Sequence, residues 1–248
     1  MTSLMAKLPP PSAGIVLTHF IVSDDVERSR RFYTEVLGGR VTFPGDPVNV
    51  ALANSWIVVN GGGGPTDDKP TVILETPRDP DRVSSFLNIR VRDMEAVYAG
   101  WSARGAQFLT PPKQHQYEKR CYIRDPDGHL IEVGQTTDPG GDWTPPHWPS
   151  SGPVSGSDAV SAELPPPPEG IVLAHFIVSD DVERSLRFYT EVLGGRLAFS
   201  GPGGLTYVAL SNSWIIINTG GGPTDDKPTV TLETPRDPDR VKIGRAHV

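Results

Sequence analysis

Hydrophobic residues follow two different spacings over the first 83 residues of the chain. Gly14–Val22 is a run of mainly β-branched residues with the length of a strand. Val26–Leu37 carries apolar residues at helical spacing, preceded by the N-cap residue Asp25 and followed by the stop signal Gly38–Gly39. Three further segments have the composition of strands: Arg40–Phe43, Val48–Asn60 and Thr71–Pro77. The pattern therefore predicts a β-α-β-β-β unit.

The next 50 residues repeat this order of elements. Ser85–Val91 is predicted as a strand, and Asp93 is placed to cap a helix over residues 94–106. Residues 107–111, 119–124 and 129–135 are then predicted as strands, with a tight turn at Asp125–Gly128. Two tandem βαβββ modules predict an α+β fold in which each module is a curved sheet, exposed on one face until another module covers it.

A long internal repeat is the strongest signal in the sequence. Residues 14–40 recur at 170–196, residues 51–60 recur at 209–218, and residues 62–83 recur at 220–241. A period this long is typical of a duplicated domain rather than a solenoid. The second copy matches only the first βαβββ unit of the first copy, so the chain is expected to hold one complete domain and one half-domain.

These patterns divide the chain into five parts. They are an N-terminal tail (1–13), a complete domain (14–137), a Pro/Gly/Ser-rich linker (138–169), the half-domain (170–241) and a C-terminal tail (242–248). The final residues IGRAHV are what a common sequencing-adapter string would encode, so the tail is interpreted as non-native; a natural end is the alternative. The half-domain is expected to expose one sheet face, through which the chain would self-associate or aggregate.

The composition of the chain indicates which classes of molecule it is expected to bind. The net charge is −7, and no basic stripe is present to neutralise phosphates, so neither nucleic acid nor an anionic membrane is an expected partner. No apolar run approaches the length of a membrane span. The single cysteine, Cys121, suits a reducing cytoplasm and is interpreted as an inert core thiol. A small molecule is the expected ligand of a cytoplasmic protein.

Two motifs carry a family resemblance. DVERSRRFYTEVLGG (Asp25–Gly39) resembles the first-helix signature of the vicinal-oxygen-chelate superfamily, which includes glyoxalases, bleomycin-resistance proteins and dioxygenases. YIRDPDGHLIEV (Tyr122–Val133) resembles the closing hairpin of the same superfamily. The resemblance implies a cup, formed by the two paired modules, that opens over a metal ion or a small ligand.

The resemblance also implies four inward-facing positions, occupied here by His19, Glu75, Phe86 and Glu132. One imidazole and two carboxylates could hold a divalent ion, and Zn, Ni, Fe, Mn and Mg are not distinguished. Phe86 departs from the family pattern because phenylalanine cannot bind a metal. His19 lies ten residues before Ser29, where the family has eleven, so its side chain could face the opposite side of the strand.

Each candidate has a structural alternative. His19 could be a packed core histidine, Glu75 a surface residue, and Glu132 the partner of a nearby arginine. Glu132 and Glu75 are also the candidate catalytic groups. The candidate substrate-binding residues are Phe86, Asn88, Trp56, His115 and Tyr122. His115 could serve as a general base, although a solvated hairpin is the alternative interpretation of its segment.

Two functions remain open at this point. The first is a metal-dependent lyase, isomerase or dioxygenase acting on a small vicinal-oxygen-bearing molecule, with His19, Glu75 and Glu132 as metal ligands. The second is a metal-free protein that binds and sequesters a small aromatic or drug-like molecule, which Phe86 at a ligand position favours.

Overall fold

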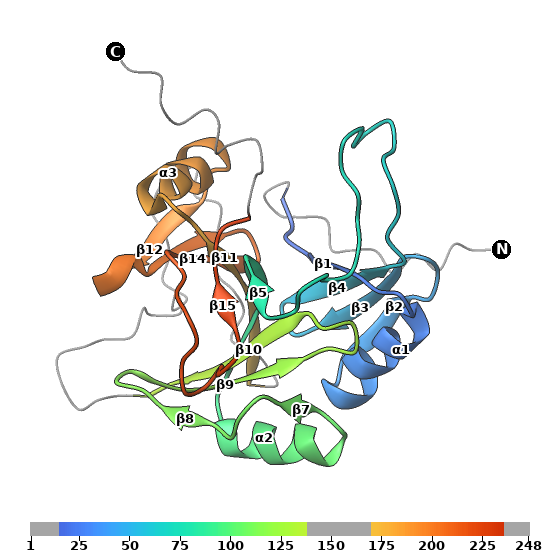
Figure 1. Cartoon of the computed structure of the whole chain (residues 1–248), viewed down its shortest axis with the longest axis horizontal. Helices are drawn as coiled ribbons and strands as arrows, with labels where there is room; N and C mark the ends of the chain where they lie inside the picture. Colours follow the sequence, from blue (N-terminus) through green and yellow to red (C-terminus); the bar gives the residue numbers. More distant parts are fainter. Residues whose placement is uncertain (1–14, 138–169, 236–248) are drawn as a thin grey trace, which may run out of the picture.

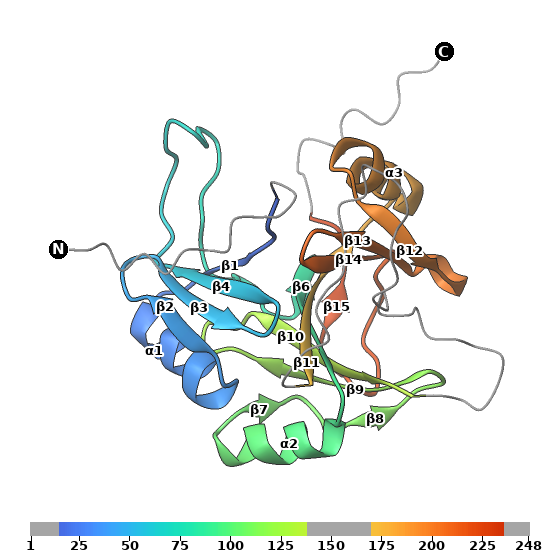
Figure 2. The same ribbon diagram turned by 180° about the vertical axis from the view of Figure 1, so that it is seen from behind.

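A computed structural model describes residues 15–137 and 170–235 (Figures 1 and 2). We call residues 15–83 the first half, 84–137 the second half and 170–235 the third half. The predicted tails 1–13 and 242–248 and the linker 138–169 lie outside the described residues. The mixed α+β fold with many strands and few helices is confirmed. No helix within the two described ranges is long and apolar enough to cross a membrane.

The first half forms a four-stranded sheet with one helical segment. Its elements are β1 (His19–Val22), α1 (Val26–Arg31), η1 (Phe32–Val36), β2 (Arg40–Phe43), β3 (Val48–Leu52) and β4 (Ser55–Asn60). The strand order is β1-β4-β3-β2, with β1 parallel to β4 and the other pairs antiparallel. Strand β1 therefore lies at an edge of this sheet.

Local sequence sets both ends of the helical segment. The Asp25 carboxylate accepts a hydrogen bond from the Arg28 backbone N–H at 3.0 Å, as an N-cap residue does. The last turn widens to π-helical bonding, with Leu37 N–H donating to Phe32 C=O. Gly38 then adopts a φ of +88°. A Cβ at Gly39 would lie 2.5 Å from Val50 Cγ1, so only glycine allows the chain to pass there.

The second and third halves repeat this design. Strand β5 (Arg82–Val83) ends the first half. The second half contains β6 (Ser85–Val91), α2 (Met94–Ala103), β7 (Gln107–Phe108), β8 (Lys113–Gln114), β9 (Glu118–Arg124) and β10 (Leu130–Thr136). The third half contains β11 (Ile171–Val178), α3 (Val182–Arg187), η2 (Phe188–Val192), β12 (Arg196–Ser200), η3 (Pro202–Gly204), β13 (Thr206–Leu210), β14 (Ser213–Asn218) and β15 (Thr231–Leu232).

Two strand pairings join the third half to the preceding part of the chain: a short parallel pair of β15 with β5, and a long antiparallel pair of β11 with β6. Strand β6 is parallel to β10 on one edge and antiparallel to β11 on the other, from Val91–Ile171 to Ser85–Ile177. The result is a continuous sheet in the order β12-β13-β14-β11-β6-β10-β9-β7, with β8 paired to β9. This sheet curves across the centre of the molecule, while the first-half sheet lies to one side (Figures 1 and 2).

Two of the three apolar clusters contain residues of the second half, and the remaining one is built on the sheet of the third half. The larger cluster joins the first half to the second and includes Tyr33, Ile57, Ile89 and Trp101. The other lies between the second half and the third, where Phe86 stacks on Phe176 with 4.3 Å between ring centroids. Burying each such aromatic side chain contributes about 1.5–3 kcal/mol. The second half therefore packs against the first half on one side and against the third half on the other.

The prediction of which halves share a hollow was wrong. The first and second halves were expected to close around it, leaving the third half uncovered. Instead the first half packs on the second through the larger cluster, and β6 gives its remaining edge to β11. Strands β1 and β11 are nearly identical in sequence, so either could have taken that edge. The face expected to drive self-association is covered within the chain: Phe176 and Trp214 are buried. The domain boundaries themselves remain predictions.

Two predicted strands also differ. Val48–Asn60 is a hairpin of two strands, turning at Ala53, whose φ is +49°. Thr71–Pro77 is not a strand: only Leu74 makes an isolated bridge, to Gly63. The last strand of the first-half sheet is therefore β4, and Glu75 lies beyond this sheet in an exposed segment.

The first and third halves meet across an approximate twofold axis. Asn54 exchanges two hydrogen bonds with the Leu173 backbone, at 3.0 and 2.7 Å. Its counterpart Asn212 does the same with the Leu17 backbone, at 2.7 and 2.9 Å. Such an isologous contact is typical of a symmetric dimer interface, formed here between two parts of one chain.

We predict that Asn212→Ala or Asn54→Ala lowers the free energy of unfolding by about 1–3 kcal/mol, because each leaves partly buried backbone groups without partners. Urea unfolding of each variant measures this. Gln116→Ala is the control, since this exposed amide bonds only to its neighbour Tyr117. Equal unfolding midpoints for all three variants and the parent chain would contradict the role of the two amides.

Candidate functional site

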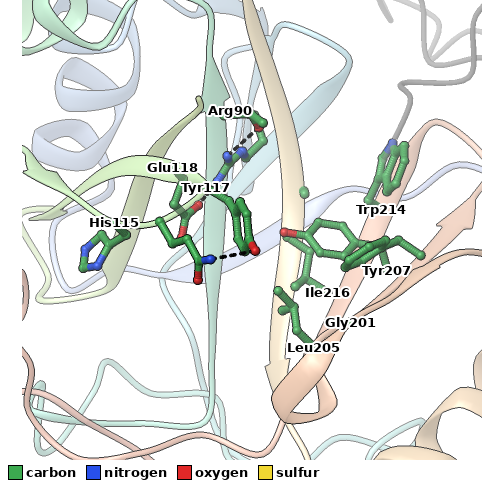
Figure 3. Close-up of a pocket in the computed structure, with 13 residues that line it drawn as sticks. Arg90, His115, Tyr117, Glu118, Gly201, Leu205, Tyr207, Trp214 and Ile216 are labelled. Carbon is green, nitrogen blue, oxygen red and sulfur yellow. Dashed lines mark hydrogen bonds and ion pairs between the residues drawn. The ribbon is translucent and has the colours of Figure 1, made fainter. Parts of the chain in front are cut away.

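The second and third halves enclose two adjoining cavities of about 390 and 310 Å³. The larger cavity has an aromatic wall from the third half and a polar wall from the second half (Figure 3). The smaller one continues toward the loop after β14. Volumes of this size are typical of small-molecule sites.

The aromatic wall comes from β12, β13 and β14. Tyr207 lies at the centre, with its ring edge-on to Phe199 and to Trp214 at 5.9 Å between centroids. Leu205 and Ile216 complete this side of the cavity. Alternation along β14 directs Trp214 and Ile216 to one face of the sheet, as the period of a strand requires. This wall offers flat apolar surface to a ligand.

The polar wall is built around Arg90 on β6. Its guanidinium donates to Glu118 Oε2 at 2.8 Å and to Thr136 Oγ1 at 3.0 Å. Burial disfavours the charge on Arg90, but the carboxylates of Glu118 and Glu132 more than compensate, and its pKa is raised. Burial likewise opposes ionisation of Glu118, yet the two arginines beside it hold the Glu118 pKa below its ordinary value. This wall is an ion pair that stays charged.

Glu132 lies at the base of the smaller cavity and is buried. Its Oε1 accepts from Asn88 Nδ2 at 2.6 Å, and its Oε2 accepts from the Tyr122 hydroxyl at 2.8 Å. Burial raises the Glu132 pKa, although Arg120 and Arg90 act in the opposite direction. Among the described residues no hydrogen bond reaches Asn88 Oδ1, which is buried at this cavity. That oxygen is free to accept a hydrogen bond from a bound molecule.

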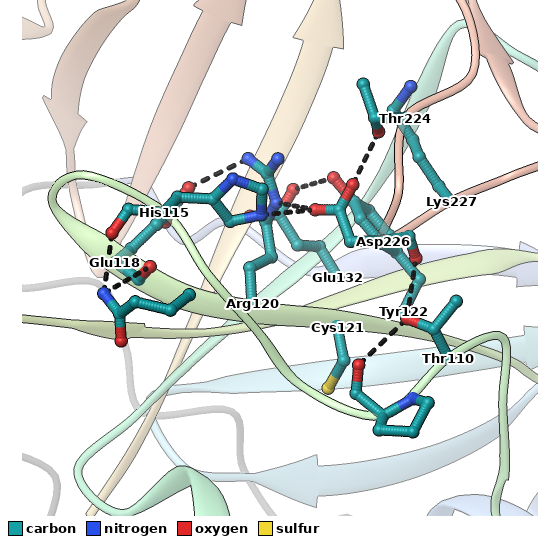
Figure 4. Close-up of polar contacts among 12 residues, drawn as sticks. Thr110, His115, Glu118, Arg120, Cys121, Tyr122, Glu132, Thr224, Asp226 and Lys227 are labelled. Atoms are coloured by element: carbon teal, nitrogen blue, oxygen red, sulfur yellow. Dashed lines mark hydrogen bonds and ion pairs between the residues drawn. The ribbon is translucent and has the colours of Figure 1, made fainter.

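We call the two adjoining cavities together the cup. A loop of the third half, which carries Thr224, Asp226 and Lys227, borders the smaller cavity (Figure 4). The Asp226 carboxylate accepts a hydrogen bond from Arg120 Nε at 2.6 Å, and it lies 3.0 Å from His115 Nε2. Burial alone would raise the Asp226 pKa, but the Thr224 hydroxyl and the Arg120 guanidinium hold it low. The neighbouring Lys227 is also buried, which lowers its pKa. These pairs join the second and third halves by charge as well as by strand pairing.

The structure brings four of the predicted site residues to the cavities and places a fifth, Phe86, in the apolar cluster beside them. Phe86, Asn88, His115, Tyr122 and Glu132 all lie at the boundary between the second and third halves. Their roles remain predictions. Trp56 is in the first half and lines neither cavity; its counterpart in the repeat, Trp214, lines the larger one.

The other two predicted residues lie elsewhere. Glu75 pairs with Arg78 at 2.7 Å in the exposed segment after β4. His19 lies in the contact between repeats, where its Nδ1 is 3.3 Å from His175 Nδ1. Burial, together with the nearby His175 and His129, lowers the His19 pKa to about 3 and keeps the ring uncharged.

A metal ion does not fit this arrangement of donors. His19, Glu75 and Glu132 contact three different sets of residues, and no three His, Cys, Asp or Glu side chains gather as a metal site within residues 15–137 and 170–235. The pairing of β6 with β11 separates Glu132 from the first half. The counterparts in the third half do not gather around Glu132 either, because His175 lies against His19 and Glu233 pairs with Arg82. The metal-ligand role that the resemblance implied is therefore not supported for these three residues.

Several cup residues were missed from the sequence. Arg90, Tyr207 and Asp226 are the clearest cases. The repeat contained a signal for one of them: Tyr207 replaces Asn49 at the equivalent position, within the stretch where the two copies differ most. This difference between the copies could be interpreted only when the strand that pairs with β6 was known.

Comparison with known proteins agrees with this fold. The sequence model of the Glyoxalase/Bleomycin resistance protein/Dioxygenase superfamily matches residues 15–133 and again 172–229. No curated protein matches the chain.

Many solved structures of the superfamily resemble the chain over about half its length. A glyoxalase/bleomycin resistance protein/dioxygenase from Nocardioides is 18% identical and covers 52% of this chain and 89% of its own, with a TM-score of 0.42. An antibiotic binding protein from a Streptomyces species is 22% identical and covers 50% and 98%, with a TM-score of 0.36. A glyoxalase-related enzyme from Fulvimarina pelagi is 21% identical and covers 49% and 88%, with a TM-score of 0.39.

The family match extends over most of the chain, in both copies of the repeat, and the βαβββ halves agree with it. The chain belongs to the Glyoxalase/Bleomycin resistance protein/Dioxygenase superfamily.

Proposed function

We propose that the cup between the second and third halves binds a small organic molecule with an aromatic or apolar part and a hydrogen-bonding end. The observation that carries this proposal is the pairing of the two walls. Tyr207, Leu205 and Ile216 offer apolar surface, while Arg90 and Glu118 stand opposite. Apolar pockets with a few convergent polar groups are the usual form of a ligand site.

The aromatic wall would supply most of the binding free energy. A flat ring placed beside Tyr207 and Trp214 buries apolar area on both sides and gains the edge or stacking contacts that aromatic groups favour. The polar groups would then fix orientation, since Arg90 and Glu118 are already paired and change little on binding. Asn88 Oδ1 would accept from a donor that reaches the smaller cavity.

The binding function is favoured over the metal-dependent reaction. Elemental analysis after dialysis separates the two hypotheses. The binding function predicts no stoichiometric divalent metal in the chain. Retention of one ion per chain that is lost in Glu132→Ala would instead favour the metal-dependent lyase, isomerase or dioxygenase.

We predict that Leu205→Trp, which fills the wall shared by both cavities, weakens binding of the aromatic anion 8-anilino-1-naphthalenesulfonate at least tenfold. A tenfold change corresponds to about 1.4 kcal/mol of lost contact. Fluorescence titration measures the affinity. Trp56→Ala is the matched control, because Trp56 is equivalent to Trp214 but lies outside the cup. Equal weakening in both variants would place the dye elsewhere and contradict the proposal.

The burial of Glu132 gives a pH prediction. Its folded-state pKa is raised above the ordinary value of 4.5, so the folded chain holds this proton more tightly than the unfolded chain. Glu132 therefore makes its full contribution to the free energy of unfolding below about pH 4.5, and this contribution is lost as the pH rises through the pKa of Glu132 in the folded state. Glu132→Gln, which mimics the protonated acid, should be more stable than the parent at pH 7 and equal to it near pH 3.

Urea unfolding between pH 3 and pH 8 tests this. Tyr122→Phe is the opposing variant, because it removes the hydroxyl that stabilises the ionised carboxylate. The free energy of unfolding of Tyr122→Phe should fall below that of the parent chain as the pH rises. A constant difference between Glu132→Gln and the parent chain at every pH would show that Glu132 carries no burial penalty.

A further inference from the structure

The carboxylates that line the cup are already bound to other side chains of the protein. Both oxygens of Glu132 accept hydrogen bonds, one from Asn88 Nδ2 and the other from the Tyr122 hydroxyl. Both oxygens of Glu118 accept from arginine side chains. Three open groups, meaning polar atoms without a hydrogen-bond partner among the described residues, lie instead on β6, β9 and β13. Their chemistry indicates what kind of molecule the cup takes.

Asn88 on β6 carries the first open group. Its Nδ2 is committed to Glu132, so Oδ1 is the part of the amide that is left for a ligand. No described residue donates to Oδ1, although the side chain is buried and lines the smaller cavity. A buried acceptor without a donor costs free energy, and a ligand that brings a donor to this oxygen recovers it.

Arg120 on β9 carries the second open group. Its Nε donates to Asp226 at 2.6 Å and its Nη1 donates to Glu118 at 2.8 Å (Figure 4). No described residue accepts from Nη2, and Arg120 also lines the smaller cavity. Burial opposes the charge on Arg120, but the carboxylates around it outweigh burial and raise its pKa. Arg120 therefore offers the cavity N–H donors that keep their protons.

Tyr207 on β13 carries the third open group. It lines both cavities, and its hydroxyl is directed from the aromatic wall toward the second half (Figure 3). No hydrogen bond joins this hydroxyl to a described residue. Burial raises the pKa of Tyr207 to about 12, so the hydroxyl stays protonated at neutral pH. It is a neutral donor placed where the two cavities meet.

The three open groups together are two donors and one acceptor. A carboxamide answers all three on one planar, uncharged group, since its oxygen accepts and its N–H donates. A carboxylate would bring a negative oxygen to Asn88 Oδ1 in a cavity that Glu118 and Glu132 also line. An ammonium group would lie beside the Arg120 guanidinium. Hydrogen bonding and charge therefore favour the same neutral group.

We infer that the ligand of the cup is a neutral aromatic carboxamide. Its carbonyl oxygen accepts from Arg120 Nη2 and from the Tyr207 hydroxyl, and its N–H donates to Asn88 Oδ1. Its ring lies in the larger cavity against the aromatic wall. This inference rests on the proposed function and names the chemical class of the molecule that the site binds.

Four probes with the same naphthalene ring test the inference on the full chain. They are naphthalene-2-carboxamide, methyl naphthalene-2-carboxylate, naphthalene-2-carboxylate and 2-naphthylmethylammonium, and isothermal titration calorimetry measures their affinities. The carboxamide should bind at least tenfold more tightly than each of the others. The ester keeps the carbonyl but brings no donor to Asn88 Oδ1, and the two ions carry the disfavoured charges.

The failures of the two proposals are distinguishable. Equal affinity for carboxamide and ester, or tighter binding of either ion, would overturn the inference and leave an aromatic binding site in place. Binding of none of the four probes would overturn the proposed function as well.

Two variants locate the contacts. Asn88→Leu should reduce the advantage of the carboxamide over the ester to less than twofold, with the ester affinity reporting that the cavity is intact. Tyr207→Phe keeps the ring of the wall and should weaken carboxamide and ester alike, by threefold or more. A tenfold advantage that persists in Asn88→Leu, or unchanged affinities in Tyr207→Phe, would overturn the inference. Should Asn88→Leu fail to fold, the four probes on the parent chain decide alone.

Discussion

The free edge of β6 determines the organisation of this molecule. Strand β10 occupies one edge of β6, and the other edge can accept only one partner. Because β11 takes it, the second half is shared between two neighbours: its sheet joins the third half, and its helix-side core packs on the first. The cup, its aromatic wall and its ion pairs all follow from that single antiparallel pairing.

The same constraint explains why near-identical residues have different surroundings. His19 and His175 meet each other, Trp214 lines the cup while Trp56 does not, and Asp226 is buried in ion pairs. None of these differences lies in the residues themselves. Duplication supplied two equivalent sets of side chains, and the strand pairing assigned one set to a ligand cavity. The two cavities are lined by aromatic side chains and by carboxylates paired with arginines, a chemistry suited to holding a small molecule.

Much of the fold could be predicted from the sequence, and the pairing could not. Strand β6, helix α2 with its Asp93 cap, and the hairpin of β9 and β10 follow from periodicity and turn residues. The sequence does not indicate whether β1 or β11 pairs with β6, because the two segments GIVLTHFIV and GIVLAHFIV differ at one residue. Five site residues were predicted because they belong to the second half, which lines the cup whichever partner it has. Glu75 and His19 were misplaced for a reason that the pairing does not change, because their counterparts Glu233 and His175 also lie outside both cavities.

Disulfide trapping tests the pairing most directly. Asn88 and Ala174 are directly opposite across β6 and β11, at a separation that a disulfide can span. The account predicts that Asn88→Cys with Ala174→Cys forms an intrachain disulfide on mild oxidation. It also predicts that Asn88→Cys with Thr18→Cys does not, although Thr18 is the counterpart of Ala174. A disulfide in the second double variant and none in the first, seen by mass spectrometry of the monomer, would contradict it.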